Sequence, residues 1–203
     1  HERGLAHLAL HPGNVLLDDK MHVQLSDYGR RPDMLCHLLL ADTKINTTES
    51  RWLYTPPELL RVMLTKQPNM STSQWWTSST DMWSLGCLIA RLISLRHLYA
   101  TSNVAYGPPL FHAIVKGEVD LTETLRQEDV GLSITIVTWL VMLCNECAAF
   151  SPKHRISAAT AAANLGNKEA REAKKELRAT SVEPNERATW SAAGPRKGSC
   201  LPQ

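Results

Sequence analysis

The sequence predicts a mainly helical α+β domain with one small β-hairpin. Two patterns carry this prediction. Residues 14–26 hold two short apolar or alternating segments around a turn, as in a hairpin, and residues 82–95 are apolar on nearly every side, as in a buried central helix. The composition agrees, because 43% hydrophobic and 21% charged residues over 203 positions are typical of a globular protein. This composition excludes a collagen-like, coiled-coil or wholly disordered chain.

The first thirty residues predict the end of a helix followed by the hairpin. Residues 1–7 have the composition of the polar end of a helix, which Gly4 would stop. Residues 14–17 form a short apolar strand, and residues 18–20 have turn composition. Residues 22–26 then alternate with a period of two, which completes the predicted hairpin.

Two polar segments predict loops. Residues 30–55 hold several hydroxyl side chains and little apolar periodicity outside residues 34–41, so we expect a long functional loop. Residues 65–80 are polar around Trp75 and Trp76 and predict an inserted loop. The two tryptophans either anchor a protein partner or pack onto the domain surface.

The remaining elements are predicted to be helices. Pro57 and Glu58 open a short helix that runs to Met63. Thr80 is a suitable N-cap for the central helix, and Asp81 suits its first turn. Further helices are expected over residues 108–117, 133–150 and 156–165, the last ending at Gly166.

The chain divides into a folded domain, residues 1–166, and a charged tail, residues 167–203. Residues 168–177 mix Glu, Lys and Arg with Ala, so they predict an exposed helix. From Thr180 onward, proline, glycine, serine and charged residues outweigh large apolar ones, which predicts disorder.

Charge and cysteine content restrict the partners and the compartment. The net charge of +2 is too balanced for strong attraction to nucleic acid, and no apolar run approaches the roughly 18 residues of a membrane span. Five scattered cysteines do not suggest a disulfide framework, so we expect the cytoplasm. Cys144 and Cys147 form a C-x-x-C pattern in an apolar run. We interpret them as core residues, with a zinc site as the alternative, because zinc usually needs two further ligands.

Five short motifs follow one another along the chain. They are H-L-A-L-H-P-G-N at residues 7–14, D-Y-G at 27–29, Y-T-P-P-E at 54–58, T-D-M-W-S-L-G at 80–86 and S-P-K-H-R at 151–155. In this order they resemble the catalytic loop, the D-F-G motif, the A-P-E segment, the central helix and the late arginine motif of eukaryotic protein kinases. The resemblance covers residues 1–165 and implies the large, C-terminal lobe of a protein-kinase-like domain, with the hairpin at its catalytic loop.

The resemblance also implies that the small lobe is missing. In kinases the glycine-rich loop, the strand lysine and the helix glutamate all precede the catalytic loop. Residues 1–4 already resemble the end of the helix that leads into that loop, so the chain is expected to be a fragment. ATP and Mg²⁺ are therefore expected only in a full-length form, and neither is expected to bind tightly to this fragment.

Two polar residues match the family's metal-binding positions. Asn14 corresponds to the amide that holds a second magnesium ion, and Asp27 to the carboxylate that holds the first. Both supply the oxygen ligands that Mg²⁺ prefers. The alternative is that Asn14 closes a loop by hydrogen bonds and that Asp27 is a turn residue.

Other matches belong to the family's scaffold. His7 and Tyr28 correspond to two stacked positions that align an active kinase internally, and Gly29 completes the second motif. Asp81 matches the helix carboxylate that holds the backbone of the catalytic loop. A last scaffold match predicts a buried ion pair between Glu58 and Arg155.

The departures from the family pattern fall on the chemistry. Ala9 stands where kinases have the aspartate that accepts the substrate proton, and a methyl group accepts no proton. His11 replaces a lysine near the transferred phosphate and is mostly neutral at pH 7. Leu8 replaces an arginine that pairs with a phosphorylated loop, and Arg51 stands where a threonine is usual. No catalytic residue is thus intact at the base or phosphate-lysine positions.

Retention of the scaffold without the base predicts a pseudokinase that acts as a protein-interaction scaffold or regulator. Two alternatives stay open: an active serine/threonine kinase that transfers the ATP γ-phosphate to protein, and an interaction fragment that binds no nucleotide. The H-x-A-L sequence and the insertion before the central helix resemble the TBC-domain-containing kinase-like proteins. That resemblance implies protein partners and a link to Rab GTPases or membrane trafficking.

Overall fold

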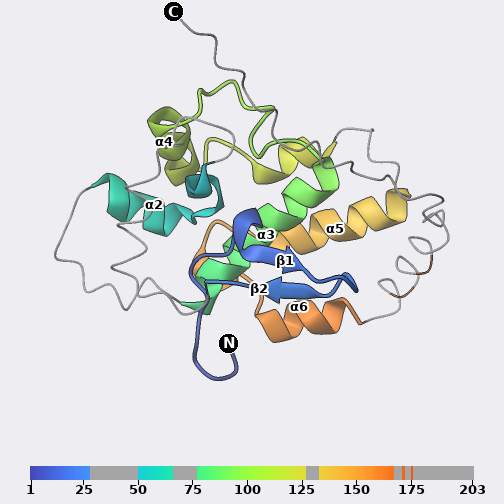
Figure 1. Ribbon diagram of the computed structural model, residues 1–203. Helices are drawn as coiled ribbons and strands as arrows, with labels where there is room; N and C mark the ends of the chain where they lie inside the picture. Colours follow the sequence, from blue (N-terminus) through green and yellow to red (C-terminus); the bar gives the residue numbers. More distant parts are fainter. Residues whose placement is uncertain (28–49, 66–76, 127–132, 167–170, 172–174, 176–203) are drawn as a thin grey trace, which may run out of the picture.

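The computed structural model describes residues 1–27, 50–65, 77–126 and 133–166, together with residues 171 and 175. Its strands and α-helices, labelled as in Figure 1, are β1 (Val15–Leu17), β2 (Val23–Leu25), α2 (Pro57–Leu64), α3 (Ser78–Ser94), α4 (Pro108–Lys116), α5 (Ile134–Cys147) and α6 (Ala158–Asn164). Short 3₁₀ helices cover Pro12–Asn14, Arg51–Tyr54, Leu121–Arg126 and Pro152–His154. The predicted α+β, mainly helical architecture is confirmed.

Helix α3 runs through the centre of the molecule, and the other elements pack around it (Figure 1). Helix α5 lies along α3, while α2 and α4 pack against each other to one side. Ten of the seventeen residues of α3 are buried, as expected for a central helix. The elements on both sides of α3 therefore pack against the same helix.

The main hydrophobic core joins α3 to the segment before α2 and to α4. The rings of Trp52 and Phe111 stack with their centroids 5.0 Å apart, and Phe111 is completely buried. Trp83, Leu98 and Leu110 belong to the same cluster. A second cluster joins α3, α5 and α6 through Met82, Leu143, Cys147 and Ala161.

The β-hairpin is confirmed. Strands β1 and β2 are antiparallel, with Val15 opposite Leu25 and Leu17 opposite Val23. Asp18 stabilises the turn by accepting hydrogen bonds from the backbone N–H groups of Lys20 and His22, each at 2.8 Å. These bonds, above all the one from His22, lower the pKa of Asp18.

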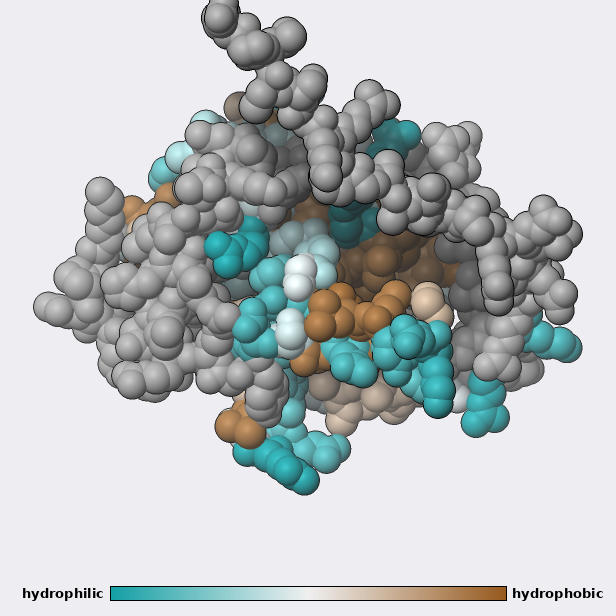
Figure 2. Space-filling view, in the orientation of Figure 1, coloured by the Kyte–Doolittle hydropathy of each residue, from teal (hydrophilic) through white to brown (hydrophobic). Residues whose placement is uncertain are grey.

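The hairpin exposes apolar side chains. Leu17 is 56% exposed and Val23 is 64% exposed, and Leu16, Met21 and Leu25 are also exposed. Figure 2 shows the corresponding apolar patch on the face of the molecule that carries the hairpin. None of the helices in the described ranges is both long and apolar enough to cross a bilayer.

Two predictions near the ends of elements are wrong. Residues 1–7 contain no helix: Gly4, at φ +69°, ends a tight turn in which its N–H donates to the His1 carbonyl at 2.9 Å. The N-cap of α3 is Thr77 rather than Thr80. Thr80 lies inside the first turn and is buried, and its neighbour Asp81 accepts a hydrogen bond from the His7 N–H.

The predicted loop over residues 30–55 is also wrong at its end. Arg51–Tyr54 forms a 3₁₀ helix in which the Ser50 hydroxyl accepts from the Trp52 N–H, and Trp52, Leu53 and Tyr54 are buried. These large side chains enter the core, so a polar loop is not an option there. The sequence predicts no element over two further parts of the fold, residues 97–107 and the 3₁₀ helix Leu121–Arg126.

Several other predictions lie outside the described residues. They concern residues 28–49 and 66–76, which include Trp75 and Trp76, and the tail beyond Gly166 apart from residues 171 and 175. The helices predicted over 57–63, 108–117, 133–150 and 156–165 are confirmed as α2, α4, α5 and α6, although α5 ends at Cys147 and α6 begins at Ala158.

At Gly86, helix α3 packs tightly against the C-terminal end of α5. A Cβ atom at this position would lie 2.7 Å from the Ala148 Cβ and 3.1 Å from the Ala148 nitrogen. We expect Gly86→Ala to lower the free energy of unfolding by about 1–3 kcal/mol, because the helices must separate. Leu92→Ala, at a side chain of α3 that is 71% exposed, is the control and should change stability by less than about 0.5 kcal/mol. Urea denaturation measures both, and a stabilised Gly86→Ala protein would contradict the close packing.

Candidate functional site

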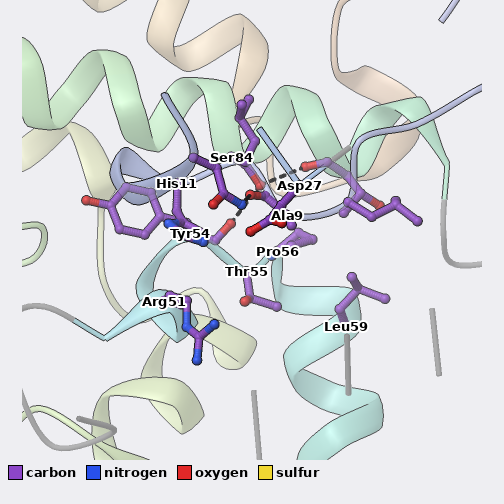
Figure 3. Close-up of a pocket in the computed structure, with 13 residues that line it drawn as sticks. Ala9, His11, Asp27, Arg51, Tyr54, Thr55, Pro56, Leu59 and Ser84 are labelled. Carbon is purple, nitrogen blue, oxygen red and sulfur yellow. Dashed lines mark hydrogen bonds between the residues drawn. The ribbon is translucent and has the colours of Figure 1, made fainter. Parts of the chain in front are cut away.

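A pocket of about 80 Å³ lies between the segment that follows His7, the 3₁₀ helix Arg51–Tyr54 and the first turns of α3 (Figure 3). It is smaller than the roughly 300–1,000 Å³ of most small-molecule sites. Four of the sequence-predicted site residues line it together. They are Ala9, His11, Asn14 and Asp27.

Asp81 fixes the backbone at the entrance to this pocket. Its two carboxylate oxygens accept hydrogen bonds from the backbone N–H groups of His7 and Leu8, each at 2.7 Å. The Nε2 atom of His1 lies 2.7 Å from the same carboxylate. Burial raises the pKa of Asp81, while the two N–H groups act in the opposite direction. One carboxylate of α3 therefore holds a segment more than seventy positions away in sequence.

The backbone that Asp81 holds is strained at Leu8. Leu8 has φ +65°, in the left-handed region that non-glycine residues seldom adopt. Such a conformation costs roughly 1–3 kcal/mol and persists only when its surroundings impose it. Here the two N–H groups that point at Asp81 impose it, so the loop shape is set by the anchor rather than by local preference.

The residue at the predicted base position is held through its backbone atoms. The Ala9 carbonyl accepts a hydrogen bond from the Asn14 Nδ2 at 2.8 Å, and the Ala9 N–H donates to the His7 Nδ1 at 3.3 Å. Asn14 is buried, and its amide closes this loop. Since the bond uses its Nδ2, the Oδ1 atom of Asn14 is the atom that suits a metal ligand.

His11 acts as a cap for the 3₁₀ helix that ends at Asn14. Its Nδ1 accepts a hydrogen bond from the Gly13 N–H at 3.1 Å. A ring nitrogen accepts a hydrogen bond through a lone pair, so this contact uses the Nδ1 lone pair of His11. At the position where the resemblance implies a lysine, the structure therefore has an imidazole that caps a 3₁₀ helix.

Asp27 follows β2 and lines the same pocket, exposed to solvent and at φ +58°. Aspartate adopts this left-handed conformation more readily than most residues. Tyr28 and Gly29 lie outside the described residues. Among the described residues, no group of three or more His, Cys, Asp or Glu side chains is arranged to hold a metal ion.

The ion pair expected between Glu58 and Arg155 is present beside the base of α3. Arg155 Nη1 and Nη2 donate to the two carboxylate oxygens of Glu58 at 2.6 and 2.8 Å. The Arg155 side chain is fully buried, and its guanidinium carbon lies 5.1 Å from the centre of the Trp83 ring. The remaining N–H groups donate to the carbonyls of Ser79, Ala149 and Phe150.

Two contributors to the site were not singled out from the sequence. Ser84 lines the pocket, and its hydroxyl lies 2.8 Å from the Tyr54 carbonyl and 3.2 Å from the Thr80 carbonyl (Figure 3). In the sequence, Ser84 is a polar residue between the apolar residues 82–83 and 85–90 of α3, and this pattern could have indicated its role. His1 offered no signal, because its contact with Asp81 depends on tertiary structure alone.

Cys144 and Cys147 are core residues. Both are completely buried in α5, and the Cys144 thiol donates to the Gly86 carbonyl at 3.3 Å. Burial raises the pKa of each thiol to about 12, and raises that of Cys87 well above its ordinary value. Their complete burial, and the bond from Cys144 to a backbone carbonyl, are typical of cysteines in a core.

Comparison with known proteins agrees with the geometry of these motifs. The family model described as the protein kinase domain matches residues 1–165. The chain belongs to the protein kinase domain family. It is 32% identical over 155 residues to the serine/threonine-protein kinase fused of Drosophila melanogaster. This alignment covers 71% of this chain and 17% of that protein.

Two further relatives differ in name from this kinase and from each other. The TBC domain-containing protein kinase-like protein of Gallus gallus is 28% identical over 165 residues, covering 76% of this chain and 17% of the relative. The 3-phosphoinositide-dependent protein kinase 1 of Rattus norvegicus is 30% identical over 126 residues. This alignment covers 61% of this chain and 19% of that protein. The chain thus spans less than a fifth of the length of these three relatives.

The Glu58–Arg155 pair gives the first prediction for this site. Truncation of either residue to alanine should cost roughly 3–5 kcal/mol, because a buried charge loses its partner, and the double mutant should cost less than the sum. Lys116 and Glu118, an exposed pair with an N–O distance of 3.5 Å, supply a control cycle with a coupling of about 0–1 kcal/mol. Urea denaturation measures all variants. Additive costs at Glu58 and Arg155 would show that the two side chains are not coupled.

Asp81→Asn should loosen the strained segment at His7 and Leu8. The two backbone N–H groups bind different oxygens of Asp81, and asparagine replaces one of these oxygens with an NH₂ donor. One N–H group therefore loses its acceptor, so we expect a loss of about 1–3 kcal/mol in stability. Hydrogen exchange of the two amides should accelerate more than the average for the domain. Asp19→Asn, in the exposed hairpin turn, is the control that should leave both rates unchanged. Equal protection in the Asp81→Asn protein would refute the anchoring role.

The buried thiols should resist alkylation. At pH 8 the folded protein should show little modification of Cys87, Cys144 and Cys147 by iodoacetamide, because each is buried and protonated. Peptide mass spectrometry measures the modification at each site, with urea-denatured protein as the fully reactive reference. Rapid labelling of Cys144 or Cys147 in the folded protein would contradict the core assignment.

Proposed function

We propose that the chain is part of a catalytically impaired kinase domain, a pseudokinase, that acts through contacts with protein partners. One observation carries this proposal. Where the family resemblance places the proton-accepting carboxylate, the pocket presents the methyl group of Ala9. A general base must reach the proton that it abstracts within about 2.6–3.2 Å, and a methyl group has no lone pair to offer.

The other residues of the pocket do not supply an obvious base. Among the thirteen described residues that line it, Asp27 is the one carboxylate, and the family resemblance assigns it to the metal-binding position. His11 uses its unprotonated nitrogen to cap the helix at Gly13. To accept a substrate proton at this nitrogen, the ring would have to give up that bond.

A metal-bound nucleotide fits the residues that are retained. The Asn14 Oδ1 and the Asp27 carboxylate are hard oxygen donors, and Mg²⁺ is commonly held by one or two such groups together with substrate phosphates and water. We propose that these two residues would hold Mg²⁺ and ATP in a full-length form of the protein. The metal would supply charge neutralisation at the phosphates. Without the base, binding would proceed with little or no phosphoryl transfer.

Serine/threonine kinase activity is the second candidate function. It is favoured by the identity of 30–32% with proteins that are named as kinases. In that case positioning alone, or an unconventional base, would replace the missing carboxylate. The similarity to a protein named as TBC domain-containing and kinase-like favours the pseudokinase candidate. For that candidate we propose protein partners linked to Rab GTPases or membrane trafficking.

A phosphate-transfer assay separates the two candidates. The full-length protein is compared with Ala9→Asp, with Ala9→Asp combined with His11→Lys, and with Asp27→Ala. We expect no transfer by the unmodified protein, because an acid–base group contributes about 10²–10⁴-fold to rate, and we expect measurable gain only in the variants that restore the base.

Binding of Mg²⁺–ATP, followed by calorimetry, is the second readout. Asp27→Ala should weaken it, whereas Asp19→Ala, which removes an exposed carboxylate of the hairpin turn, should not. Turnover of the unmodified protein at ~1–100 s⁻¹, abolished by Asp27→Ala, would overturn the pseudokinase proposal and establish the kinase alternative.

A further inference from the structure

We draw no further inference here: the strongest candidate, the exposed apolar face of the β1–β2 hairpin around Leu17, Val23 and Leu25, carries nothing because no contact among the described residues shows what covers it.

Discussion

The helical part of the domain depends on the hydrogen bonds of one buried group, the guanidinium of Arg155. Its N–H groups reach the Glu58 carboxylate at the start of α2, the Ser79 carbonyl at the start of α3 and two carbonyls just after α5. A buried charge is costly unless every donor is satisfied and an opposite charge lies close by. Here both conditions are met, and the planar group also lies against the Trp83 ring. Three helices consequently have fixed relative positions at one point.

Helix α3 connects the Arg155 contacts to the pocket. The same first turns that meet Arg155 through Ser79 carry Asp81, which holds His7 and Leu8, and Ser84, which contacts the Tyr54 carbonyl. The pocket is thus built on a rigid helix, although its lining comes mostly from irregular backbone. This division explains how a left-handed leucine persists beside the candidate site: the strain is confined to one loop and opposed by a carboxylate from the core.

Much of the fold follows from the sequence, because the hairpin and the helices have clear periodicities. The start of α3 does not. Four successive hydroxyl residues at positions 77–80 are all acceptable caps, and local sequence does not choose among them. Gly4 is compatible with a helix stop and with a turn, which explains the error over residues 1–7. The composition of the site was expected from motif order. Its dimensions, the cap at His11 and the contact of His1 depend on packing between distant segments, which local patterns do not encode.

The way in which residue 9 is held separates the shape of its loop from the chemistry of its side chain. Its N–H and its carbonyl are both engaged, by His7 and Asn14. Any L-residue carries these two backbone groups, so the same contacts are open to an aspartate and to an alanine. The loop is thus shaped by the backbone of residue 9, whereas proton transfer at this position would depend on its side chain alone.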